Sequence, residues 1–169
     1  MTTDDAPLTR SQVRESLARE RAKLLAALEG LSEGELTRSG AVGHWSVRDV
    51  LAHLLAWEEE AVARLELLAA ERPQDIAWID DQDEQKLEAW NASAQQRYAG
   101  LALAEVMRRL AEVQGRILVG LGSLSTERLG TDAGPVPVHN WLPDCTYAHE
   151  QEHCADILAW RRSIETSEA

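Results

Sequence analysis

Most of the chain alternates between segments with apolar residues at every third or fourth position and short polar connections. Such spacing is typical of amphipathic helices. Several segment ends carry residues that favour helix termini. Thr9 and Gln12 fit a capping box, Ser46 is a suitable N-cap, and Gly30 and Gly100 are natural stops. The pattern predicts helices over about residues 9–29, 46–71, 84–98, 103–121 and 143–163, with one short turn at 32–35.

No segment shows the strict alternation of a half-buried strand, and the pair Val136 and Val138 is interrupted by proline. The sequence therefore predicts an all-α fold: a four-helix bundle with an extra, smaller helix between the second and third bundle helices. With 169 residues, the chain is long enough for one domain with a proper core. We expect that core to span residues 8–163, with frayed tails at 1–7 and 164–169.

Net charge, the length of the apolar runs and the cysteine count argue against several classes of protein. The formal net charge of -12 argues against an electrostatic nucleic-acid binder. No apolar run approaches the roughly 20 residues of a membrane span, and the acidic N-terminus lacks the features of a signal peptide. Two cysteines, Cys145 and Cys154, are too few for a disulfide framework. We therefore expect a cytoplasmic protein with reduced thiols and neither a nucleic-acid nor a membrane partner.

The most informative chemistry lies near the C-terminus, where His149 and His153 are four residues apart in a predicted helix. Residues at this spacing share one helix face, so both imidazoles can reach one metal ion, which usually needs at least a third ligand. A weak internal repeat supplies it: Trp45 precedes His53 by the same spacing as Trp141 precedes His149. Two related hairpins about a pseudo-twofold axis would bring His53 to the pair. The alternative is an exposed histidine pair, with His53 at the edge of the core stripe.

The segment WSVRDVLAHLLAWE at 45–58, followed far downstream by Tyr147-Ala-His149-x-x-x-His153, resembles the DinB/YfiT-like superfamily. The run from Thr146 to Trp160 resembles the ClbS/DfsB-type branch most. The resemblance covers about residues 8–162. It implies a four-helix bundle, often dimeric, with a divalent metal on one histidine of the second helix and two of the last. Those positions are His53, His149 and His153 here. Activities in the superfamily include thiol-cofactor transferases, an isomerase and self-resistance hydrolases, so the fold transfers better than the reaction.

Three neutral imidazoles bind Zn, Ni or Fe(II) comparably, so the metal's identity stays open. Three protein ligands leave a position for water or substrate, which is the arrangement of catalytic sites. His149 to His153 also spells the H-E-x-x-H motif of zinc proteases, in which the glutamate is the base. Without a strand to hold a peptide, a protease is disfavoured. Glu150 remains a candidate base for other chemistry, with a solvated surface glutamate as the alternative.

Cys145 lies near the start of the last predicted helix, where a lowered thiol pKa would suit a nucleophile; a small buried residue is the alternative. Trp45, Trp57 and Trp141 are candidates to line an apolar substrate pocket beside the metal, although tryptophans in bundles are mostly core. Ile157, Leu158 and Trp160 cover more than one face of the last helix, which favours a homodimer contact.

These observations predict a metal-dependent enzyme that transfers a low-molecular-weight thiol to a reactive small molecule or hydrolyses it. The alternative is a non-catalytic bundle that sequesters a small molecule or serves only for dimerisation. The two differ in a checkable way: an enzyme needs an open coordination position that faces a cavity, whereas a structural bundle would pack the histidines without one.

Overall fold

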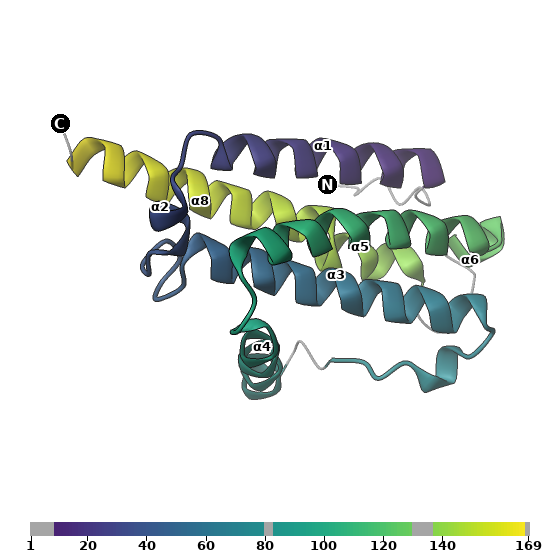
Figure 1. Ribbon diagram of the computed structural model, residues 1–169. Coiled ribbons are helices and arrows are strands. Elements are labelled where there is room, and N and C mark those ends of the chain that lie inside the picture. The colour runs from purple at the N-terminus through teal and green to yellow at the C-terminus, as the bar shows by residue number, and fades with distance from the viewer. Residues whose placement is uncertain (1–8, 80–82, 130–136, 168–169) are drawn as a thin grey trace, which may run out of the picture.

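The computed structural model describes residues 9–79, 83–129 and 137–167. Four long helices lie side by side as a bundle (Figure 1): α1 (Arg10–Leu28), α3 (Val47–Ala69), α5 (Leu103–Ser123) and α8 (Tyr147–Ser167). Helix α1 packs along α8, and α3 packs along α5. The described residues contain no strand, only an isolated bridge between Val42 and Trp45. The all-α bundle predicted from the sequence is confirmed.

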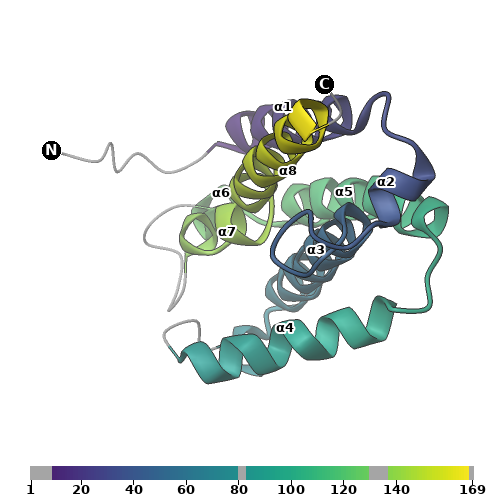
Figure 2. The same ribbon diagram turned by 90° about the vertical axis from the view of Figure 1, so that its left-hand side faces the viewer.

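The smaller helix α4 (Glu84–Tyr98) lies outside the bundle. It crosses α3 at a steep angle, since Figure 1 views α4 end-on whereas Figure 2 views it side-on and the bundle end-on. Side chains of α3 and α4 fix this crossing. Arg48 Nη2 donates to the carbonyl of Leu101 at 2.7 Å, and Gln95 Nε2 donates to the carbonyl of Asp49 at 2.7 Å. The guanidinium of Arg48 also donates to the carbonyl of Tyr98, the last residue of α4. These bonds, of which those from Arg48 are charge-assisted, hold α4 against the bundle.

Capping boxes start three of the helices where the sequence predicts them. Thr9 caps α1 with Gln12, and Ser46 caps α3 with Asp49. The predicted turn at 32–35 is the short helix α2 (Glu33–Thr37), which Ser32 caps. In each box the hydroxyl accepts from a backbone N–H of the first turn, so the exposed donors of the helix end are satisfied. The polar linker after α3 contains one 3-10 turn, η1 (Pro73–Asp75).

The start of the last helix differs from the prediction. Pro143 does not open α8 but lies in a separate turn, α7 (Leu142–Cys145). Thr146 breaks the helix with φ -136° and ψ -112°, and its hydroxyl donates to the carbonyl of Leu142 at 2.6 Å. Helix α8 therefore begins at Tyr147, and it runs past the predicted end near residue 163. The preceding connection also contains α6 (Thr126–Leu129) and η2 (Val138–Asn140).

Leucine, valine, isoleucine and alanine side chains of the four long helices form a single buried core. None of the described helices combines the length and hydropathy needed to cross a bilayer. Buried polar side chains interrupt this core at several places, among them His53, Arg64 and the group of Arg21, Glu58 and Glu150.

Candidate metal centre

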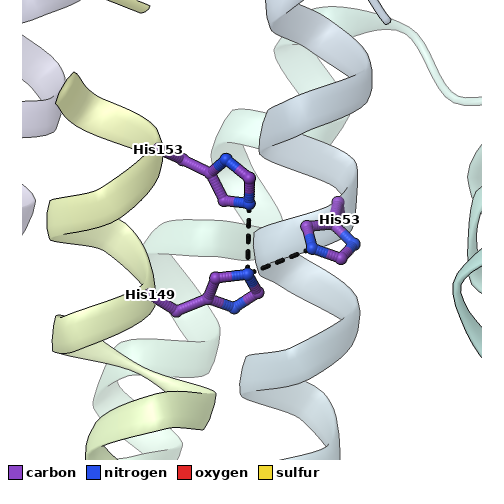
Figure 3. Close-up of side chains that lie close together, drawn as sticks. All are labelled: His53, His149 and His153. Carbon is purple, nitrogen blue, oxygen red and sulfur yellow. Dashed lines mark hydrogen bonds between the residues drawn. The ribbon is translucent and has the colours of Figure 1, made fainter. Parts of the chain in front are cut away.

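Three histidines converge between α3 and α8 (Figure 3). His53 projects from α3, and His149 and His153 project from one face of α8, one turn apart, as their i, i+4 spacing requires. The Nε2 atom of His149 lies 3.1 Å from Nε2 of His53 and 3.1 Å from Nε2 of His153. The ligand nitrogens of the three residues all lie within 4.8 Å of one another.

Hydrogen bonding alone does not account for this arrangement. The Nε2 atom of His149 carries either one proton or one lone pair, so it cannot form two well-aligned hydrogen bonds at once. A shared cation accounts for both contacts. Two nitrogens bound to one tetrahedral metal at about 2.0–2.1 Å lie roughly 3.3 Å apart. The two separations from Nε2 of His149, 3.1 Å each, are close to that value. The donor set therefore fits a divalent metal such as Zn, Ni or Fe.

Asp156 fixes the orientation of one of these rings. The Nδ1 atom of His153 lies 3.1 Å from Oδ2 of Asp156. A carboxylate only accepts, so Nδ1 carries the proton and Nε2 keeps its lone pair for the cluster. The Nδ1 atoms of His53 and His149 are buried and have no hydrogen-bond partner among the described residues. Packing orients those two rings: that of Trp45 lies 5.0 Å from that of His53, centroid to centroid.

Burial keeps two of the histidines uncharged. The pKa of His53 falls to about 4, first because burial disfavours the imidazolium and then because of charge repulsion with His153. The pKa of His149 falls to about 3, again chiefly through burial, with repulsion from His53 and His153 added. Both imidazoles are therefore neutral near pH 7, which is the form that binds a metal.

A cavity of about 420 Å³ adjoins the cluster, with His53 and His149 in its wall. Trp57 and Trp141, two of the candidates for a substrate pocket, also line this cavity, together with the partly exposed Trp78 of the linker. Trp45 is not among the lining residues; it packs behind His53. The volume falls in the range of about 300–1,000 Å³ that is typical of small-molecule sites.

The two residues expected to have catalytic roles lie in different surroundings. Cys145 lines the cavity and is 3% exposed, with its sulfur 3.6 Å from Nη1 of Arg64. Glu150 is not part of the lining and is 1% exposed. Its Oε1 accepts from Nε of Arg21, whose guanidinium also binds Glu58. The alternative of a solvated surface glutamate is therefore wrong: a carboxylate buried this deeply needs the cation that it has.

Arg64 is a lining residue that the sequence analysis missed. It follows His53 by eleven positions and Trp57 by seven on α3. Three helical turns amount to about eleven residues, so this spacing returns the side chain to the face that carries His53. That periodicity is the signal that could have found it.

A family model described as the DinB superfamily matches residues 16–157. The fold is similar to an uncharacterised protein from Escherichia coli UTI89, with a TM-score of 0.80 and 16% identity over 96% of this chain and 98% of that chain. It is also similar to DfsB, described as a sibling lethal factor precursor (TM-score 0.76, 20% identity, 92% and 96% covered). A third similar structure is the colibactin self-resistance protein ClbS in complex with dsDNA (TM-score 0.75, 11% identity, 95% and 98% covered). No curated protein matches the chain.

The dsDNA is a partner of ClbS; for this chain we expect no nucleic-acid partner from the sequence. That expectation came from the net charge of -12, which governs long-range attraction to phosphates. Net charge averages over the surface, so one local patch can still contact DNA. Charge alone therefore does not exclude a nucleic-acid partner for a bundle of this architecture.

Proposed function

The chain belongs to the DinB superfamily, and on that premise we propose that it is a metal-dependent enzyme acting on a small molecule. His53, His149 and His153 hold the metal in this proposal. The observation that carries it is the convergence of three Nε2 atoms at the wall of a cavity, two of them on imidazoles that burial keeps neutral. A metal with three protein ligands keeps a coordination position for water or substrate.

The bound metal would supply acidification of a water or thiol, or polarisation of a carbonyl. The chain's own residues position that chemistry. Asp156 holds the lone pair of His153 toward the cluster. Trp57, whose indole N–H donates to Oδ1 of Asn91 at 3.3 Å, and Trp141 present apolar surface that binds the body of the substrate and excludes water. Cys145 lies in the same wall as a candidate nucleophile.

We propose two reactions, transfer of a low-molecular-weight thiol to an electrophile and hydrolysis of a reactive metabolite. The description of ClbS as a self-resistance protein supports a reactive small molecule as the substrate. The alternative is a bundle that sequesters such a molecule without turnover. A histidine cluster that opens onto a cavity favours the enzyme, because a purely structural cluster gains nothing from access to ligand.

Turnover of chromogenic electrophiles and activated esters tests the proposal. Zn-, Ni- or Fe-loaded protein should consume a substrate, and the dependence on added thiol separates transfer from hydrolysis. His149→Ala should abolish turnover, whereas His44→Ala, which changes an exposed histidine outside the cluster, should leave it intact. Cys145→Ser tests the thiol separately. Binding of the substrates without turnover in any metal form would favour sequestration.

A further inference from the structure

Arg64 has surroundings that an arginine with a purely structural role does not require. The residue is 4% exposed, yet it lines the cavity beside the histidine cluster. It is the one lysine or arginine among the described residues of that lining. The other charged lining residues are Asp144 and Glu152, both exposed at the rim. The only buried positive charge in the wall therefore belongs to Arg64.

The guanidinium is held rigidly by three neighbours. Its Cζ lies 4.7 Å from the ring centre of Trp78 and 5.4 Å from that of Trp141. Its Nε donates to Oε1 of Glu60 at 2.9 Å. Contact with two aromatic faces and a carboxylate at one edge fixes the plane of the group before any ligand arrives.

The opposite edge of the guanidinium has no oxygen acceptor among the described residues. Nη1 contacts only the sulfur of Cys145 at 3.6 Å, a weak acceptor. An arginine presents Nη1 and Nη2 as a fork that matches the two oxygens of a carboxylate or phosphate. A buried fork without an oxygen acceptor, in a cavity wall, is a recognition group for such an oxyanion.

We propose that Arg64 binds an oxyanion group of the substrate, a carboxylate or phosphate, and so defines the substrate class. This inference rests on the proposed function in one respect: the part of the substrate that reacts is taken to lie at the histidine cluster. Arg64 lies eleven residues from His53, roughly 16 Å along α3, and its side chain leans back toward the N-terminus and shortens that gap. The substrate is thus an elongated small molecule that reacts at the histidines and carries its oxyanion at the far end. Tryptophan faces contact the apolar body between them.

The test compares three probes of similar shape: 4-phenylbutanoate, 3-phenylpropyl phosphate and the neutral 4-phenylbutanamide. Dissociation constants are measured by ligand-observed NMR for Zn-loaded and for chelator-treated protein. Wild type should prefer an oxyanion to the amide in both forms, and the stronger of the two oxyanions identifies the group. Arg64→Gln should weaken oxyanion binding about tenfold or more, with the amide changed less than about twofold.

Two variants separate recognition from a structural role. Glu60→Gln removes the negative charge beside the guanidinium but keeps an amide oxygen that can accept from Nε, so oxyanion binding should tighten. Arg116→Gln, which changes an exposed arginine paired with Glu66 on the bundle surface, should leave all three probes unaffected. If Arg64 only anchors Trp78 and Trp141, Arg64→Gln weakens the amide as much as the oxyanions, and Glu60→Gln weakens binding too.

Other outcomes distinguish the inference from the proposed function. If the preference for an oxyanion disappears on chelation but survives in Arg64→Gln, the anion binds the metal. That result overturns the role of Arg64. A preference that depends on Arg64 in protein that binds no metal upholds the inference while the metal centre fails. A wild type that binds the amide as tightly as both oxyanions refutes the inference outright.

Discussion

Replacement of Arg21 by methionine should destabilise the bundle more than any single surface change. The side chain is 9% exposed, and its Nη2 lies 2.6 Å from Oε1 of Glu58 while its Nε binds Glu150. Its Nη1 also donates to the carbonyl of Leu110 at 2.6 Å. Arg21→Met fills a similar volume but leaves two carboxyl groups in the core without a cation.

Removal of one partner from a buried ion pair costs about 3–5 kcal/mol. A domain of this length loses roughly 2–4 °C of Tm per kcal/mol, so the melting temperature should fall by about 6–20 °C. The loss should grow between pH 5 and pH 8, because ionising a buried carboxyl costs more without the guanidinium.

Thermal and urea unfolding, followed by far-UV circular dichroism, measure the effect. Arg116→Met is the matched control, since the pair of Arg116 and Glu66 is exposed and such pairs contribute about 1 kcal/mol or less. The control should therefore melt within about 4 °C of wild type. An Arg21→Met protein that also melts within that range would refute the importance of this buried network.

Three further predictions follow from the packing and the buried charges. Burial raises the pKa of Glu58 well above 4.5, so its contribution to stability is fully present below pH 4.5 and is lost as pH rises toward the folded pKa. Glu58→Gln cannot ionise, so its unfolding free energy should rise relative to that of wild type by up to about 1.4 kcal/mol per pH unit in that window. Urea unfolding measures the difference between the two proteins, and an equal difference at pH 5 and pH 8 would contradict this. A Cβ at Gly120 would lie 3.0 Å from Cβ of Leu65, so Gly120→Ala should lower the unfolding free energy by about 1–3 kcal/mol. A Cβ at Gly115 would have nothing within 4 Å, so Gly115→Ala should raise the unfolding free energy by about 0.5–1 kcal/mol. Of the three residues from which a homodimer contact was predicted on α8, Ile157 and Trp160 are buried in the core and only Leu158, at 38%, is exposed, so the contact stays a prediction. Light scattering should give twice the mass of one chain, and a monomeric mass would refute it.

Local sequence signals determine where most of the helices begin and end, so the fold can be predicted well from the sequence. The capping residues Thr9 and Ser46 and the period of the apolar stripe lie within a few residues of the structure they determine. Helix α4 matches its predicted bounds for the same reason. The start of α8 was missed because Thr146 breaks the helix through its own dihedral angles and a bond to Leu142, which no periodicity reports.

The same difference between local and long-range signals applies to the candidate site. The grouping of His53 with His149 and His153 follows from spacing on two helices and from the family resemblance. The surroundings of Glu150 and Arg64 depend on which helix packs against each face, and that is a long-range property. A buried glutamate and a solvated one look alike in the sequence until the cation on α1 that neutralises it is located.

Metal content tests most directly whether His53, His149 and His153 form a metal centre. Protein purified without a histidine tag is analysed for Zn, Ni and Fe by elemental analysis, together with His53→Ala, His149→Ala and the control His44→Ala. We expect close to one metal per chain in wild type and in His44→Ala, and loss of the metal from the two cluster variants. Wild-type protein that binds no divalent metal even after supplementation would contradict the metal centre.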